Sequence, residues 1–179
     1  MPTPFGPWTI KSSERVYADP FVQLSVDQVV RPDGLDGQHV VVKIKPGVCV
    51  IAVDDQRSVH LTKEFHYAVG RDTVECVSGG IEPNDSADAT ARRELQEELG
   101  LVASEWLPLL TVDPFTAIMA SPTRLYLARG LSRVEATPEP TELIEHLIMP
   151  LSQAVAMVEQ GEITHAPSCV AILLADKRC

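Results

Sequence analysis

Hydrophobic and polar residues alternate between residues 21 and 30, which is the pattern of a strand with one buried face. A turn sequence at residues 31–34 then leads into a second β-prone stretch. Residues 48–53 are entirely apolar and mostly β-branched, which indicates a central strand buried on both faces. We expect strands at residues 21–30, 38–45, 48–53, 58–65, 73–77, 106–112, 124–128 and 143–149.

Three segments have the pattern of helices. The first lies between Asn84 and Gly100, which supply a natural helix start and stop. The second covers residues 151–159, and the third begins near Pro167, because proline is favoured in the first turn of a helix. Three further segments contain proline and are expected to be irregular: residues 1–15, 113–122 and 135–142.

Strands mixed with three helices predict a layered α/β or α+β fold. The break at residues 46–47, a Pro-Gly pair, divides the chain. We expect a small N-terminal antiparallel β unit over residues 1–45 and a main domain over residues 46–179.

Three glutamates share one face of the first predicted helix. Glu94, Glu97 and Glu98 are spaced by three and four residues, so their side chains are neighbours, and an apolar stripe lies beside them. Carboxylates that converge beside a loop suit a hard cation, and Mg²⁺, which retains waters for a phosphate substrate, fits best. The alternative is an acidic helix face that lies in solvent.

Composition narrows the function classes. The chain has 179 residues and a net charge of −10, which argues against binding to a nucleic-acid backbone. The four cysteines are scattered without a CxxC pair, so we expect free thiols in a reducing cytoplasm rather than a zinc site. No basic and apolar leader begins the chain, and no apolar run approaches the ~18 residues that span a membrane.

The spacing around the glutamates resembles the Nudix box, G-x5-E-x7-R-E-U-x-E-E-x-G-U with U aliphatic. Gly79 matches its first glycine, and the run from Arg93 to Leu101 matches its second half. One position departs, because the first glutamate of the pattern falls on Asp85, which has a shorter side chain. The resemblance implies a Nudix fold, an α/β/α sandwich around a mixed sheet.

The resemblance also implies a chemistry, in which water attacks a diphosphate and splits it into two monophosphates. Mg²⁺ is the expected cation and Mn²⁺ the alternative. Glu98 would be its first ligand and Glu94 its second, Glu97 would also help to hold it, and Gly79 would let the backbone approach. Arg93 would orient a box carboxylate, or lie on the surface as an ordinary cation.

A second resemblance, to the ADP-ribose pyrophosphatases, covers about residues 20–175. It rests on residues 63–70, the approach to the box, and on weaker motifs near residues 125–131, 142–152 and 161–163. It implies a homodimer in which the N-terminal unit is exchanged between the two chains. It also implies that the substrate is a nucleoside diphosphate linked to another group, and ADP-ribose or another nucleotide sugar is the first candidate. His66 departs from this pattern, because the relatives carry Arg there, which binds anions with a permanent charge.

Further site residues follow from this resemblance, each with an ordinary structural alternative. The general base would be Glu142 or Glu139, which otherwise belong to a solvated acidic loop. Asp85 is expected to be the N-cap of the box helix. The expected ligand-binding residues are His66, Glu75, Gly80 and Tyr17. The alternative for Glu75 is a place in a buried polar network. Tyr17, together with Trp8, could instead pack in a hydrophobic core.

Three functions remain to be separated. The first is a Mg²⁺-dependent diphosphate hydrolase, and the second a catalytically silent nucleotide-sugar sensor, motivated by Asp85 and His66. The third is an isomerase of diphosphate esters, which would need a reactive cysteine such as Cys76.

Overall fold

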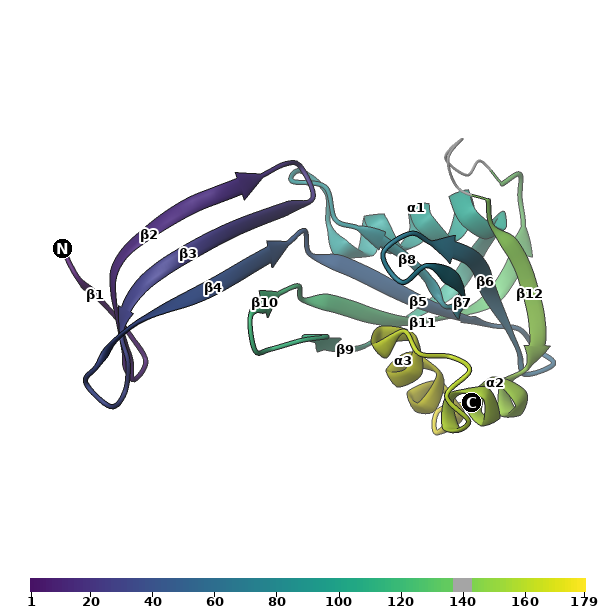
Figure 1. Cartoon of the computed structure of the whole chain (residues 1–179). Coiled ribbons are helices and arrows are strands. Elements are labelled where there is room, and N and C mark those ends of the chain that lie inside the picture. The colour runs from purple at the N-terminus through teal and green to yellow at the C-terminus, as the bar shows by residue number, and fades with distance from the viewer. Residues whose placement is uncertain (137–142) are drawn as a thin grey trace. The chain divides into compact units, whose positions relative to one another are not determined.

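The computed structural model describes residues 1–136 and 143–179 (Figure 1). The described chain forms two compact units. The first unit joins Met1–Pro46 with Asp113–Ser121, and the second joins Gly47–Val112 with Pro122–Cys179.

The first unit is a five-stranded sheet in the order β1-β2-β3-β4-β10. Its first four strands pair antiparallel, and β10 adds to β4 in parallel. The predicted strands at residues 21–30 and 38–45 are confirmed as β3 and β4. The strands are β1 (Thr3–Phe5), β2 (Trp8–Ala18), β3 (Val22–Val30), β4 (Asp36–Ile44) and β10 (Met119–Ala120).

One irregular segment of the prediction is wrong in this unit, and a second is confirmed except for a two-residue strand. Residues 1–15 form a hairpin of β1 and β2, because Gly6 adopts a positive φ of 57° at the turn. The prolines that argued against a strand lie in or beside β1, an edge strand, where a missing N–H is tolerated. Residues 113–122 contain β10, which the sequence does not signal because its regularity comes from pairing with β4.

The second unit is built on a mixed sheet in the order β12-β6-β5-β11-β9, with β7 pairing to β6 and β8 to β5. Strand β5 is central, as predicted, and its pairing with β11 is parallel while its other pairings are antiparallel. Strands β9 and β11 are longer than predicted. The strands are β5 (Gly47–Val53), β6 (Ser58–His66), β7 (Arg71–Glu75), β8 (Val77–Gly80), β9 (Leu101–Val112), β11 (Thr123–Arg133) and β12 (Glu145–Pro150).

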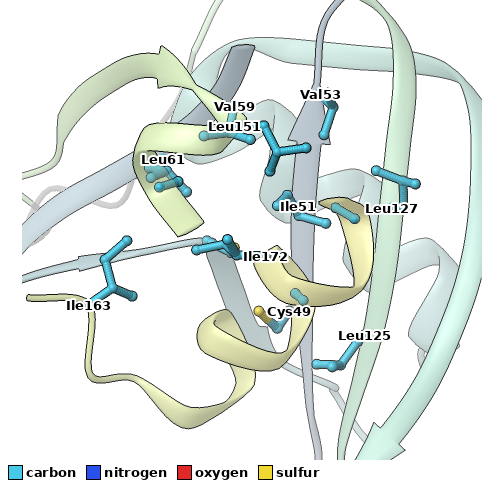
Figure 2. Packing of buried hydrophobic residues seen from close by; sticks show 14 residues of the cluster. Cys49, Ile51, Val53, Val59, Leu61, Leu125, Leu127, Leu151, Ile163 and Ile172 are labelled. Atoms are coloured by element: carbon cyan, nitrogen blue, oxygen red, sulfur yellow. The ribbon is translucent and has the colours of Figure 1, made fainter. Parts of the chain in front are cut away.

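Helices pack against both faces of this sheet. Alternate residues of β5 point to opposite sides, so Val48 and Val50 join the cluster under α1 (Ala87–Leu99), whereas Ile51 joins the cluster under α2 (Leu151–Glu159) and α3 (Ala166–Asp176). Figure 2 shows the second cluster, in which side chains from the sheet interleave with those of α2 and α3. The α/β/α sandwich and the three predicted helices are confirmed.

No helix among the described residues is long and apolar enough to cross a membrane.

Gly100 ends α1 in the left-handed conformation, with φ 60°, and its N–H bonds to the carbonyls of Gln96 and Leu95. A Cβ at Gly100 would lie 2.7 Å from the backbone oxygen of Val134, whereas a Cβ at Gly161, with φ +76°, would meet nothing within 4 Å. Both positions carry the cost of a left-handed alanine, about 1 kcal/mol, but only Gly100 adds a backbone clash.

We therefore expect Gly100→Ala to lower the free energy of unfolding by about 1–3 kcal/mol more than Gly161→Ala does, measured by urea denaturation. Equal decreases in the free energy of unfolding of the two variants would mean that the backbone around Val134 moves aside without an energetic cost.

Candidate active site

The N-terminus of α1 is fixed by two adjacent side chains. Ser86 is the N-cap, and its hydroxyl accepts a hydrogen bond of 3.1 Å from the N–H of Ala89. The prediction that Asp85 caps this helix is therefore wrong. Asp85 instead accepts hydrogen bonds from the Ser86 N–H at 2.8 Å and the Thr90 hydroxyl at 2.9 Å, so it holds the capping residue in place.

Glu94 points from α1 towards the backbone of β8. A Cβ added to Gly79 would lie 2.1 Å from the Glu94 carboxyl carbon, so glycine is required for this approach. Only 13% of the Glu94 side chain is exposed. The match of Gly79 and Glu94 to the box thus has a direct structural cause, which is the contact between a strand backbone and a helix carboxylate.

Arg93 bridges two of the box carboxylates. Its Nη2 donates to Glu94 Oε1 at 2.8 Å, and its Nη1 donates to Glu97 Oε2 at 2.6 Å. Burial acts to lower the pKa of Arg93, but the charges and hydrogen bonds of Glu94 and Glu97 outweigh it and raise the pKa. Arg93 therefore orients a box carboxylate by hydrogen bonding, and is not an unpaired surface cation.

The carboxylates of α1 suit a hard cation that keeps part of its water shell. Among residues 1–136 and 143–179, no group of three His, Cys, Asp or Glu side chains is gathered closely enough to hold a metal alone. Mg²⁺ usually takes one or two carboxylates together with waters and substrate phosphates, so a complete protein cage is not required. Glu94, one helical turn before the half-buried Glu98 and against the Gly79 backbone, fits that requirement.

Glu75, at the end of β7, lies at the centre of a second polar cluster. It is only 8% exposed, and it accepts a hydrogen bond of 2.6 Å from the Thr73 hydroxyl. His66 Nε2 lies 3.2 Å from Oε1, and His165 Nδ1 lies 2.9 Å from Oε2. Burial acts to raise the pKa of Glu75, but hydrogen bonds from His165 and Thr73 and the charges of both histidines outweigh it, and the pKa is lowered.

The remaining predicted site residues are not all brought together. Gly80 ends β8 and pairs with Gly47 of β5. Tyr17 belongs to the first unit, where it is 53% exposed and donates a hydrogen bond of 2.8 Å to Asp19, which raises its pKa. The two candidate general bases, Glu139 and Glu142, lie outside the described residues.

Sequence reasoning missed His165, which lies between α2 and α3, 90 residues after its partner Glu75 by sequence number. No local pattern links the two positions. It also missed Arg92, whose guanidinium lies 4.7 Å from the ring centroid of Trp106 on β9.

Comparisons with known proteins agree with this fold and this box. The NUDIX domain model matches residues 43–168, and the model of the nucleoside diphosphate sugar hydrolase N-terminal domain matches residues 8–42. The ADP-ribose pyrophosphatase of Bacillus subtilis (strain 168) is 29% identical over 169 residues, which cover 90% of this chain and 88% of that protein. The ADP-ribose pyrophosphatase of Mycobacterium tuberculosis (strain ATCC 25618 / H37Rv) is 30% identical over 166 residues, with coverage of 90% and 80%.

A solved structure shares the fold. The crystal structure of an ADP compounds hydrolase matches with a TM-score of 0.79 at 20% identity, covering 98% of this chain and 92% of that chain. The chain therefore belongs to the Nudix family, and it is a Nudix diphosphate hydrolase.

Replacing Gly79 tests the approach of Glu94 to β8. We expect Gly79→Ala to displace the Glu94 carboxylate and to weaken Mg²⁺ or Mn²⁺ binding by about tenfold or more, measured by isothermal titration calorimetry. Gly37→Ala is the matched control, because its Cβ would meet only the flexible side chain of Arg31, at 3.0 Å. Unchanged cation affinity in Gly79→Ala would contradict the assignment of Glu94 as a ligand.

Replacing Glu75 tests the second cluster through pH. Because the pKa of Glu75 is lowered in the folded chain, the ionised carboxylate stabilises the fold at pH values above its ordinary pKa of 4.5. This stabilisation is lost as the pH falls through the lower folded-state pKa. We expect Glu75→Gln to lose about 2 kcal/mol of unfolding free energy at pH 7, with the difference from wild type shrinking below pH 4.5.

Urea denaturation across this pH range measures the effect. Glu105→Gln is the control, since Glu105 is 65% exposed and its pair with Arg129 is solvated. A loss in Glu75→Gln that is the same at every pH would show that the Glu75 charge contributes nothing.

Proposed function

We propose that the chain hydrolyses the diphosphate bond of a nucleoside diphosphate linked to another moiety, in a reaction that depends on Mg²⁺, with Mn²⁺ as a substitute. ADP-ribose, cleaved to AMP and ribose 5-phosphate, is the leading substrate, followed by related nucleotide sugars. The close approach of Glu94 to Gly79 carries this proposal, because it brings an oriented carboxylate against the strand backbone at the start of the box. The two similar ADP-ribose pyrophosphatases support the choice of substrate.

Each box residue then has a defined task. When bound, Mg²⁺ would neutralise charge on the phosphoryl oxygens and help to orient the attacking water. Glu98 and Glu94 would hold the cation together with Glu97, and Gly79 would let the strand backbone approach it. Arg93 keeps Glu94 and Glu97 in fixed orientations through its two hydrogen bonds.

The water oxygen forms a new bond to phosphorus as the bridging P–O bond breaks, and the water proton must be accepted by a base. We assign that base to Glu142 or Glu139, as the family resemblance implies, although both lie outside the described residues.

The wider arrangement of the enzyme is also a proposal. His66, Glu75 and Gly80 would contact the ligand from the second unit, and Tyr17 would stack on a base from an N-terminal β unit exchanged within a homodimer. We take residues 1–45 as that unit and residues 46–179 as the hydrolase domain. The four cysteines are free thiols, which suits a reducing cytoplasm, and we expect no nucleic-acid partner.

The second candidate is a silent nucleotide-sugar sensor. Both carboxylate oxygens of Asp85 are engaged at the helix start, which keeps this residue from acting as the box glutamate would. Titration of ADP-ribose with Mg²⁺ separates the two functions, since tight binding without release of AMP would favour the sensor. The isomerase is disfavoured, because Cys76 is fully buried in the hydrophobic cluster under α2 and α3 and is not accessible as a nucleophile.

Replacing Glu98 tests the hydrolase directly. We expect Glu98→Gln to lower kcat for ADP-ribose by about 100-fold or more while leaving the fold intact, because the amide binds a divalent cation weakly. Release of AMP, followed by chromatography, is the measurement, and circular dichroism checks the fold. Glu159→Gln is the control, since Glu159 is an exposed residue at the end of α2. Unchanged turnover in Glu98→Gln would contradict the proposed cation-dependent hydrolysis.

A further inference from the structure

A small cavity lies on one face of the N-terminal sheet, entirely within the first unit. It is formed by side chains of β1, β2, β3 and β4 (Figure 1) and has a volume of about 90 Å³. A water molecule takes up roughly 30 Å³ in the liquid, so the cavity has room for a group of about three or four non-hydrogen atoms. Its walls include Phe5, Trp8, Ile10, Asp27, Val29 and His39.

Most of this wall is apolar or aromatic. The rings of Trp8 and His39 meet edge to face, with their centroids 5.6 Å apart and their planes at 89°. Val29, only 3% exposed, lies on the same face of β3 as Asp27, because alternate residues of a strand share a face. The carboxylate of Asp27 is therefore placed among groups that cannot replace its hydration.

One oxygen of this carboxylate is left unsatisfied. Asp27 Oδ1 is buried and has no hydrogen-bond partner among residues 1–136 and 143–179. The residue directly opposite on β4, His39, uses its Nδ1 for the carbonyl of Val40 at 3.0 Å. A buried carboxylate oxygen that accepts no hydrogen bond has lost its hydration without compensation, which is unfavourable. A ligand that brings a donor to Oδ1 would remove this cost.

Neighbouring cations of the same sheet do not supply that donor. Lys11 is bound to Asp36 at 2.8 Å. Arg15 lies on the same face as Asp27, two residues beyond the position opposite it, but it does not bond to Oδ1 in the part of the chain that the structure describes. The net charge of −10 also favours the approach of cations over anions.

We propose that this cavity binds an alkylammonium group, whose N–H donates to Asp27 Oδ1 while its stem lies against Ile10 and Val29. The carboxylate would then gain a charge-assisted hydrogen bond, and the face of the Trp8 ring would attract the cation. Burial of the methylene groups adds a favourable hydrophobic contribution. We assign the group to a small free amine, because about three or four non-hydrogen atoms fill the cavity without any contact outside it.

The two tryptophans of the chain report on this binding. Trp8 lines the cavity, whereas Trp106, in the second unit, donates its indole N–H to the carbonyl of Ala103 at 3.0 Å. Propylammonium, titrated into the full chain, should shift the NMR signal of the Trp8 indole with a millimolar dissociation constant and leave that of Trp106 in place. 1-Propanol has the same size but no charge, and it should bind about tenfold more weakly.

Replacing Asp27 tests which group holds the amine. Asp27→Asn keeps the size of the side chain but removes its charge, so we expect it to weaken propylammonium binding by about tenfold or more. Glu14→Gln is the matched control. It makes the same change in net charge, and Glu14 is an exposed residue of β2 opposite Val26, on the other face of the sheet.

Two results would overturn the inference. One is equal affinity of the wild-type chain for propylammonium and 1-propanol, a comparison that does not depend on any variant folding. The other is unchanged propylammonium affinity in Asp27→Asn.

Analytical ultracentrifugation separates a free amine from a lysine of a second copy of the chain. If the ligand is a free amine, wild type and Asp27→Asn should have the same sedimentation coefficient at every protein concentration. Loss of an oligomer in Asp27→Asn, together with no shift of the Trp8 signal by propylammonium in wild type, would assign Oδ1 to a contact between copies and overturn the inference. None of these measurements involves hydrolysis, so they are independent of the proposed function.

Discussion

The contact between the Glu94 carboxylate and the backbone of Gly79 is the constraint on which the site depends. Helix α1 must lie close enough to β8 for a carboxylate to reach the strand, and any side chain at Gly79 would prevent this. The helix is held there by Ala91 and Leu95, both fully buried under β5 and β11, and by its Ser86 and Gly100 caps. Fold stability and site geometry are thus linked, because the stripe that packs the helix lies beside the face that carries its carboxylates.

Two clusters of charged groups in the second unit differ in what surrounds their carboxylates. On α1, the guanidinium of Arg93 reduces the repulsion between the carboxylates of Glu94 and Glu97. The helix geometry places Glu94 and Glu98 on the same face. Around Glu75, a buried carboxylate accepts a hydrogen bond from the Thr73 hydroxyl and lies 3.2 Å from His66 Nε2 and 2.9 Å from His165 Nδ1. The second unit therefore contains one set of carboxylates on a helix face and one buried carboxylate at the end of a strand.

Much of the second unit could be predicted because its elements are specified locally. The apolar run at residues 48–53 required a strand buried on both faces, and the box spacing required a helix that begins after a tight turn and ends at Gly100. The capping assignment failed by one residue, because Asp85 and Ser86 are both good caps and only the backbone conformation decides between them.

The features that could not be predicted from the sequence form through contacts between residues that are distant in the chain or through a turn conformation. Strand β10 exists through its two-residue contact with β4, and β1 through a turn at Gly6 that overrides the local prolines. The contact of His165 with Glu75 arises because the core places the start of α3 beside the end of β7, and no spacing rule joins those two positions.

The most direct test of a cation held by α1 is X-ray diffraction from a crystal soaked in Mn²⁺ and a non-hydrolysable nucleoside diphosphate analogue, with data collected for anomalous scattering. We expect an anomalous peak in contact with the carboxylates of Glu94 and Glu98 and with a phosphoryl oxygen of the analogue. An ordered analogue with no anomalous peak beside these two glutamates would contradict this expectation.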